Sequence, residues 1–230
     1  MKPFSFKQFN INQSEKVFRI GTDAVLLGAL AGVFGKQNIL EIGTGTGIIS
    51  LMLAQRNSEA NITAIDINPE AVGLARENFE NAPFKERLKA FEKDFKTFDN
   101  SDKFDFVVSN PPYFDANSST KDILARQRIE LDFSDLICNT AKILSDNGIF
   151  SVIIPADERA KFIKLSKEHQ LYLTRKIDIY GIAGGTLRRN ILEFSKKSLS
   201  PKVETFIIEK APRQFSEQYL QATKDFHLFK

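Results

Sequence analysis

Cysteine and histidine are almost absent from this chain. Its 230 residues include one cysteine, Cys138, and two histidines, His169 and His227. A single cysteine excludes an internal disulfide framework, and its setting in "FSDLICNTAKIL" is typical of a buried helical residue rather than a nucleophile. Neither histidine stands near the end of a predicted strand, and we expect both at the surface. The sequence offers neither a metal-ligand cluster nor a strong base, and we expect no metal.

Long apolar runs are also missing. No stretch of about 18 apolar residues occurs, which excludes a membrane-spanning helix. The opening "MKPFSFKQFNINQ" lacks the continuous apolar core of a secretory signal. Hydrophobic residues at 42% are nevertheless ample for a core, and charged residues at 27% fit a solvated surface. We therefore expect a cytoplasmic monomer that contacts no membrane.

The net charge is only +3, but it is distributed unevenly. Residues 1–155 carry 17 Lys and Arg against 20 Asp and Glu, a net of −3. Residues 156–230 carry 15 against 9, a net of +6. A solvated surface explains this difference. The alternative is a basic flank that meets phosphates. Charge alone does not choose between them.

Short apolar segments alternate with helical patterns, which predicts a parallel sheet covered by helices. The alternation stops after residue 168. There, 171–180 and 190–197 are joined by "GIAGGTLRR", which leaves no room for a crossover helix and predicts an antiparallel hairpin at the edge of the sheet. The predicted strands are 38–43, 61–67, 87–92, 104–109 and 148–154, with a possible further strand at 203–210, and the predicted helices are 22–34, 46–56, 69–81, 133–145 and 156–168.

Three alternate glycines follow the first of these strands in "ILEIGTGTGIISLMLA". Gly43, Gly45 and Gly47 let the backbone approach a ligand without interference from Cβ, and the helix that follows offers free N–H donors. A dinucleotide site would have G-x-G-x-x-G, whereas this loop is G-x-G-x-G preceded by Glu41. The spacing resembles motif I of the class I S-adenosylmethionine-dependent methyltransferases.

Two aspartates come after the next two strands. Asp66, in "AIDINPEAV", can accept the ribose hydroxyls of nicotinamide and methionine-derived cofactors alike. Asp94, in "FEKDFKTF", is equally well explained as a surface residue. In the family that the loop resembles, the acidic residue at this point meets the adenine amino group, and the next side chain, here Phe95, lies beside the ring.

"SNPPYF" ends the strand 104–109, and "NPPY" resembles motif IV of the methyltransferases that modify exocyclic or amide nitrogens. Such a nitrogen is a poor nucleophile because its lone pair is delocalised. The side-chain oxygen of Asn110 and the carbonyl of Pro111 can accept its N–H bonds and aim the lone pair at the methyl group. Pro112 fixes the backbone, and Tyr113 offers a stacking face. A proline turn without chemistry is the alternative.

NPPY alone does not name the substrate, since it serves adenine N6, guanine N2 in ribosomal RNA and glutamine in release factors. "FRIGTDAVLLGALAG" resembles motif X of adenine-N6 enzymes, whose helix borders the methionine end of the cofactor, here at Thr22. With "FKQFNINQ" before it and "YLQATKDFHLFK" at the end, the whole chain resembles the bacterial tRNA(Val) adenine-37 N6-methyltransferase family. The segment before motif X lacks a cysteine common in that family. Release-factor enzymes carry a long helical domain before motif I, for which this chain has no room.

The resemblance implies a class I methyltransferase (Rossmann-like) α/β fold, with a seven-stranded, mostly parallel sheet and an antiparallel terminal hairpin. One domain would cover 1–230, divided into an N-terminal segment (1–36), a cofactor-binding core (37–155) and a C-terminal hairpin with a basic tail (156–230). The reaction would be N6-methylation of an adenosine in tRNA, with S-adenosylmethionine as donor and S-adenosylhomocysteine as product. The cofactor would be held by Thr22, Glu41, Gly43, Gly45, Gly47, Asp66, Ile67, Asp94, Phe95 and Asn110.

We expect RNA phosphates to meet basic residues of three segments. These are the N-terminal segment (Lys7), the segment after NPPY (Arg126 and Arg128) and the hairpin (Arg188 and Arg189). The two hairpin arginines are expected far from the glycine loop. Release-factor glutamine methylation, ribosomal RNA guanine-N2 methylation and an RNA-binding module without catalysis are the alternatives. A dehydrogenase is disfavoured because the chain lacks room for a substrate domain and a histidine near a strand end.

Overall fold

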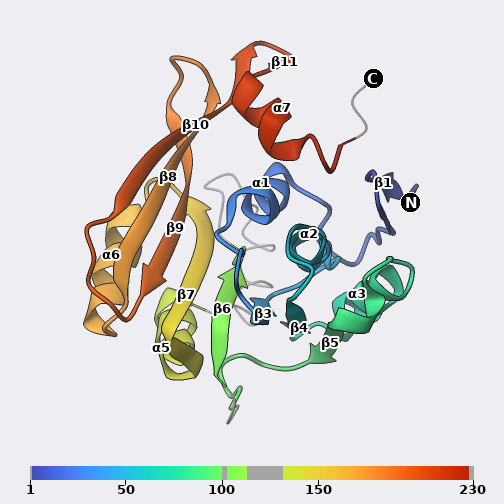
Figure 1. Ribbon diagram of the computed structural model, residues 1–230, viewed down its shortest axis with the longest axis horizontal. Helices are drawn as coiled ribbons and strands as arrows, with labels where there is room; N and C mark the ends of the chain where they lie inside the picture. Colours follow the sequence, from blue (N-terminus) through green and yellow to red (C-terminus); the bar gives the residue numbers. More distant parts are fainter. Residues whose placement is uncertain (1, 100–102, 113–131, 228–230) are drawn as a thin grey trace.

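One nine-stranded sheet organises the computed structural model, which describes residues 2–99, 103–112 and 132–227 (Figure 1). From one edge to the other, the strands are β11 (Gln214–Phe215), β10 (Lys202–Ala211), β8 (Tyr172–Ile182), β9 (Leu187–Ser195), β7 (Leu144–Pro155), β6 (Phe104–Ser109), β3 (Asn38–Ile42), β4 (Asn61–Asp66) and β5 (Leu88–Glu92). The strands from β7 to β5 are parallel to one another, and β9 runs antiparallel to both of its neighbours. The predicted α/β fold with a mostly parallel sheet is confirmed.

The predicted count of seven strands is too low for the described residues. Beyond the hairpin of β8 and β9, β10 pairs in parallel with β8, and the short β11 pairs antiparallel with β10. The further strand expected at 203–210 is therefore present, and the side chain of its Phe206 is buried. Because β10 covers β8, the hairpin is not the edge of the sheet as we expected.

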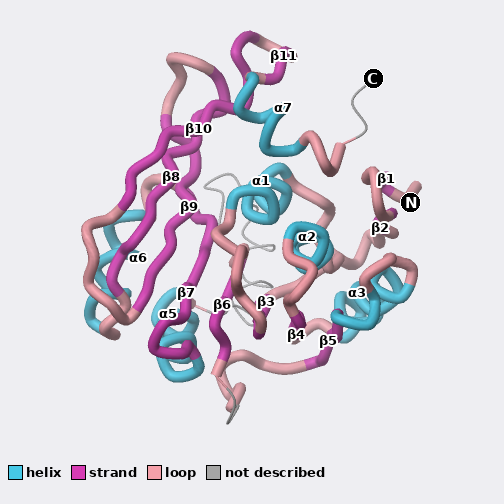
Figure 2. Tube along the Cα trace, in the orientation of Figure 1, coloured by secondary structure: helices cyan, strands magenta, loops and turns pink. Residues whose placement is uncertain are grey.

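Helices cover both faces of the sheet (Figure 2). The helices α1 (Thr22–Leu30), α2 (Ile48–Arg56) and α3 (Pro69–Glu80) contribute to one apolar cluster, and α5 (Phe133–Ile143) and α6 (Arg159–Glu168) contribute to the other. Neighbouring residues of one strand alternate between the clusters: Ile39 joins the first and Leu40 the second. Burial on both faces explains why the strands read as continuous apolar runs rather than alternating patterns. No helix within the described ranges is long and apolar enough to cross a membrane.

The starts of two helices show how local sequence acts. Asn68 caps α3, as its position before Pro69 predicts, and its side chain accepts a hydrogen bond from the N–H of Glu70 at 3.0 Å. For helix α1 the sequence favours Thr22 or Asp23 as the N-cap. The N-cap is instead Gly21, which makes no side-chain cap bond.

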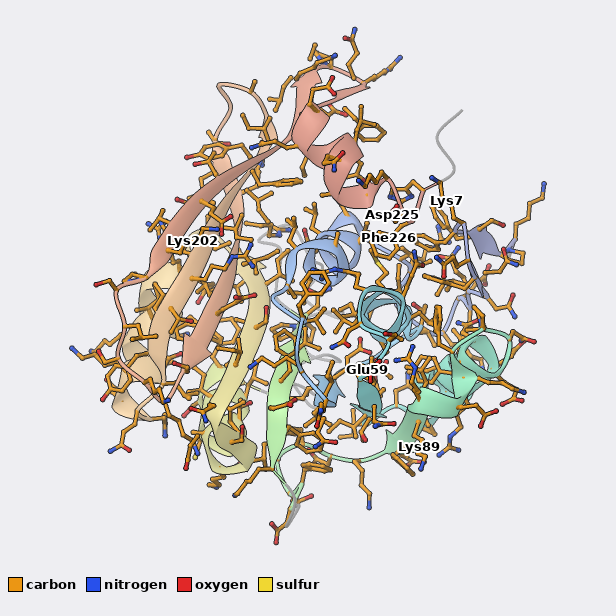
Figure 3. All side chains as sticks on the ribbon, viewed as in Figure 1. Lys7, Glu59, Lys89, Lys202, Asp225 and Phe226 are labelled. Carbon is orange, nitrogen blue, oxygen red and sulfur yellow. The ribbon has the colours of Figure 1, made fainter. Side chains whose placement is uncertain are left out.

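The described segments nearest the two ends of the chain contact each other. A short ribbon of β1 (Phe4–Ser5) and β2 (Asn10–Ile11) and a final helix α7 (Glu217–Thr223) form this region, where a 3-10 turn, η1 (Lys85–Arg87), also lies close through Phe84. The N–H of Lys7 donates to the carbonyl of Phe226 at 2.8 Å, and Figure 3 labels these two residues side by side. His227, expected at the surface, is half-buried because its ring stacks on that of Phe6.

Candidate active site

The carboxyl ends of β3, β4 and β6 lie next to one another, on the side of the sheet where the parallel strands end. Ile42, the last residue of β3, lies opposite Ile65 in β4 on one side and Ser109 in β6 on the other. Asp66 follows Ile65, and Asn110 follows Ser109, so both flank the turn after β3. Chain connections leave in opposite directions on the two sides of β3, and such a point in a parallel sheet forms a crevice that binds ligands.

The glycine loop after β3 is open toward this crevice. Gly43, Gly45 and Gly47 have φ values of 73°, 54° and 81°, the left-handed region that other residues rarely adopt. Gly43 is exposed, and a Cβ built there would meet no atom within 4 Å. Gly47 is different, because a Cβ there would lie 2.5 Å from the ring of Phe79. The first glycine thus offers bare backbone to a ligand, and the third permits close packing of α3.

Glu41 is fully buried just before this loop. Its Oε2 accepts hydrogen bonds from the Thr44 hydroxyl at 2.8 Å, from the N–H of Ser50 at 3.1 Å and from the Ser50 hydroxyl. Its Oε1 has no partner among the described residues. Burial raises the pKa of Glu41 to about 7, although the bonds from Ser50 and Thr44 work against that shift. A buried acceptor with spare capacity is suited to a polar group of a ligand.

Asp66 joins the end of β4 to the glycine loop. Its Oδ2 accepts from the N–H of Gly45 and its Oδ1 from the N–H of Asn68, both at 2.9 Å. A carboxylate has about four acceptor positions, so two remain for ligand hydroxyls. The neighbouring Ile67 exposes 43% of its surface, which provides an apolar contact beside that carboxylate.

The turn after β5 is held by helix α5, which packs on the other face of the sheet from α1, α2 and α3. Asn139 of α5 donates to the carbonyls of Phe95 and Lys96, at 3.0 and 3.2 Å. Asp94 is half-buried, and its Oδ1 accepts from the N–H of Lys96. The ring of Phe95 is 4% exposed and stacks on that of Phe98 within the core. Its contact with an adenine ring stays a prediction.

The start of the NPPY segment is anchored to β3. The hydroxyl of Ser109 donates to the carbonyl of Ile42 at 3.0 Å. Asn110 is then half-buried, Pro111 is buried and Pro112 is exposed. We had not singled out Ser109, although its place directly before NPPY was the available signal. Three expected site residues, Tyr113, Arg126 and Arg128, lie outside the described residues.

The described basic residues of the expected RNA surface have different surroundings. Lys7 is exposed, and its ammonium donates to the carbonyl of Lys224 at 2.5 Å, next to the C-terminal segment. Arg188 is exposed on β9. Arg189 instead pairs with Asp23 of α1, with 2.8 Å between Nε and Oδ2.

Arg189 also lies opposite Pro155 at the end of β7, the strand next to β6. The two hairpin arginines therefore stand at the same edge of the sheet as Asn110. Arg189 contacts the helix that carries Thr22, and the expectation that both arginines lie far from the glycine loop stays a prediction. Thr22 itself is exposed at the first turn of that helix.

A glycine loop, a strand-end carboxylate and Asn110 therefore follow the ends of three neighbouring strands, and comparisons with known proteins agree on what this combination is. The family model described as "Methyltransferase small domain" matches residues 12–176. A tRNA1(Val) (adenine(37)-N6)-methyltransferase from Flavobacteriaceae bacterium (strain 3519-10) is 54% identical over 230 residues, which are 100% of both chains. One from Bacteroides thetaiotaomicron is 38% identical over 98% of this chain and 97% of the relative. The chain belongs to this methyltransferase family.

Solved structures agree with the family on the fold. A predicted O-methyltransferase from Agrobacterium tumefaciens superposes with a TM-score of 0.70 at 20% identity, covering 89% of this chain and 96% of the other. A putative RNA methyltransferase from Pyrococcus horikoshii gives 0.56 at 22% identity, covering 86% and 94%. At such identities the likeness concerns the fold alone.

S-adenosylmethionine is the methyl donor of this family, and S-adenosylhomocysteine is the product. The crevice fits such a molecule on three observations: the open backbone at Gly43, the spare acceptor Oε1 of Glu41 and the spare acceptor positions of Asp66. Within the described ranges, no group of three or more His, Cys, Asp or Glu could hold a metal ion.

Proposed function

We propose that this methyltransferase transfers a methyl group to the exocyclic N6 of an adenosine in tRNA, specifically adenosine 37, next to the anticodon, in tRNA(Val). The observation that carries the proposal is the register of β6 with β3. Because Ser109 lies opposite Ile42, the next residues of the two strands, Asn110 and Gly43, are neighbours. The names of the full-length relatives support the choice of tRNA and of adenine N6.

The bound cofactor supplies an electrophilic methyl group, and we assign the activation of N6 to the NPPY segment. The amide oxygen of Asn110 and the carbonyl of Pro111 accept the two N6–H bonds, which opposes delocalisation of the nitrogen lone pair into the ring. The methyl group would pass from the cofactor sulfur to N6 as the bond to sulfur breaks, and N6 would then lose one of its two protons to water. Rigid acceptors fixed before reaction lower the barrier because they need not reorganise.

The cofactor would be held on the other side of β3. Asp66 would accept the ribose hydroxyls, with Ile67 against the adenine, and Asp94 would accept from the adenine amino group. Glu41 and the backbone of Gly43, Gly45 and Gly47 would border the methionine part, with Thr22 beside it. The roles of Asp94 and Thr22 follow the resemblance, and those of Ile67 and Glu41 rest on the exposed side chain of Ile67 and the spare Oε1 of Glu41.

The target adenosine would leave its loop stack to reach N6 into the crevice, as base-modifying enzymes generally require. Pro112 is exposed and, with Tyr113, would form the stacking face for the flipped base. Arg188 and Lys7, together with Arg126 and Arg128, would meet phosphates, which supply most of the affinity for RNA. We further propose that the enzyme works as a monomer in the cytoplasm.

The deciding experiment is transfer of labelled methyl to unmodified tRNA, followed by mass spectrometry of the nucleosides. N6-methyladenosine at position 37 of tRNA(Val) is the expected product, and Asn110→Ala should slow its formation strongly. Label at guanine N2 or on release factor alone would overturn the proposal in favour of the corresponding alternative. Binding of tRNA without transfer to any acceptor would support an RNA-binding module instead.

A further inference from the structure

Helix α1 is held at its C-terminal end by an arginine from the neighbouring helix. Arg56, the last residue of α2, donates to the carbonyls of Gly28 and Ala31 at 2.9 and 2.8 Å. The last carbonyls of a helix have no partner within it, so a cation at this end satisfies them and complements the helix dipole. Gly28 also packs tightly on Met52 of α2, where a Cβ would come within 2.7 Å of the sulfur.

Two residues of the hairpin hold the same end of α1. Arg175 of β8 donates to the carbonyl of Leu30 at 2.8 Å, and Glu193 of β9 accepts from the N–H of Gly32 at 2.7 Å. Arg175 and Glu193 also pair with each other at 3.3 Å, and Glu193 is 6% exposed. Buried charges that satisfy one another in this way form a rigid anchor.

The N-terminal end of α1 has a different anchor. Its N-cap, Gly21, offers no side chain, and an ion pair between Asp23 and Arg189 ties the first turn of the helix to the sheet. Both side chains are largely buried, with 22% and 26% exposed. Arg189 and Glu193 are four residues apart on β9, so they leave the same face of the sheet. One strand therefore holds both ends of the helix.

The segment that leads into α1 also forms a wall of the glycine loop. Val17 is buried, and its Cγ1 lies 4.0 Å from the position of a Cβ on Gly45. The chain from Val17 to Asp23 thus runs from the loop that faces the cofactor to the carboxylate held by Arg189. A displacement of Asp23 would therefore shift Val17 relative to the glycine loop.

We infer that Arg189 is a positioning residue for the cofactor pocket: acting through Asp23, it fixes the segment 17–23 against the glycine loop, and it is not a phosphate contact. The inference deepens the proposed function and rests on its cofactor site. The adjacent Arg188 is exposed and lies where the register between β8 and β9 shifts, whereas Arg189 is partly buried against α1. The two neighbouring arginines therefore have separate tasks, Arg188 toward RNA and Arg189 toward the cofactor.

Substitution of each arginine by glutamine provides a matched comparison. We expect Arg189→Gln to weaken binding of S-adenosylhomocysteine, measured by calorimetry without RNA, by about tenfold, which equals about 1.4 kcal/mol. Arg188→Gln should change that affinity by less than about twofold, because residues without shared contacts couple only weakly. Affinity for tRNA should show the opposite order, with the larger loss in Arg188→Gln.

Two further variants separate positioning from a general loss of stability. Asp23→Asn should weaken S-adenosylhomocysteine as Arg189→Gln does, and the double variant should be no weaker than either single one, because both break one contact. Arg189→Lys keeps the charge and should recover much of the affinity; it also serves as the comparison if Arg189→Gln does not fold. Additive losses, or an Arg189→Gln protein that loses tRNA but retains S-adenosylhomocysteine, would overturn the inference. Since the calorimetry uses no RNA, a tRNA that accepts no methyl would refute the proposed substrate and leave this result standing.

Discussion

The hydroxyl of Ser109 donates to the carbonyl of Ile42 at 3.0 Å, which joins the last residue of β6 to the last residue of β3. Both residues are buried, and each is followed at once by a part of the site: Gly43 after Ile42, and Asn110 after Ser109. The bond therefore fixes the distance between the cofactor loop and the segment proposed to bind the acceptor nitrogen.

Replacement of Ser109 by alanine should reduce methyl transfer more than it reduces stability. The loss of one buried hydrogen bond costs about 1 kcal/mol of unfolding free energy, and the freed end of β6 should lower kcat severalfold, because small displacements at a reacting centre have large effects. Ser166→Ala is the control, since Ser166 is buried in α6 and its hydroxyl has no partner among the described residues. Unfolding in urea and single-turnover transfer measure the two effects. Unchanged kcat in Ser109→Ala would show that the bond is only structural.

Asn110→Ala should affect the chemical step alone. Loss of one positioned acceptor typically raises a barrier by about 2–4 kcal/mol, so transfer should slow by a factor of roughly 30 to 10³. Cofactor affinity should hardly change, because the amide is proposed to face the acceptor base. Calorimetry with S-adenosylhomocysteine and single-turnover kinetics on tRNA test both statements. Comparable losses in binding and transfer would mean that Asn110 shapes the cofactor site.

Glu41 should make the stability of the cofactor-free protein depend on pH. Its folded pKa of about 7 lies above the ordinary value of 4.5 because burial disfavours the charged form. The folded protein therefore holds the proton more tightly than the unfolded chain, and stability should fall as pH rises from about 4.5 to about 7 and then level off. A shift of this size corresponds to about 3 kcal/mol.

Glu41→Gln removes the titrating group while its amide oxygen can still accept from Thr44 and Ser50. Urea unfolding at pH 5 and pH 8 should show a smaller loss of stability with pH in this variant than in the parent protein. Asp94→Asn is a suitable control, as Asp94 is half-buried and follows a neighbouring strand. An identical pH slope in Glu41→Gln and the parent would assign the dependence to another group.

The sequence was most informative where chemistry and conformation depend on neighbouring residues. The apolar runs around Leu40 and Val107 predict strands because both faces are buried, and Asn68 before Pro69 predicts the start of α3. Alternate glycines predicted an open loop because few other residues adopt their backbone angles. The strand at β10 was only suggested, since a largely exposed, charged strand carries little of the apolar pattern.

Contacts between distant residues could not be predicted in the same way. Asp23 and Arg189 are separated by 166 positions, and no spacing rule connects them. Arg189 looks like Arg188 in the sequence, and the place of α1, whose Asp23 pairs with Arg189, gives them different surroundings. Ser109 is similar, because its bond to Ile42 depends on the register between β6 and β3.

Binding of tRNA should weaken steeply as salt rises, and Arg188 should account for part of that dependence. Each neutralised phosphate contributes a slope of about one in a plot of log Kd against log salt, so Arg188→Gln should lower the slope by about one. Lys167→Gln is the charge-matched control. Helix α6 begins after the carboxyl end of β7 and runs back along the sheet, so Lys167 in its last turn lies toward the opposite edge from Asn110.

Filter binding at several salt concentrations would give the slopes, with unmodified tRNA(Val) as the ligand. The parent protein and Lys167→Gln should share one slope, and Arg188→Gln should be shallower while its affinity for S-adenosylhomocysteine is unchanged. If Lys167→Gln lowers the slope as much as Arg188→Gln, the attraction comes from the net positive charge of residues 156–230 as a whole. Phosphates would then have no fixed position at the end of β9, and the orientation of the RNA would have to come from contacts of the bases at the crevice.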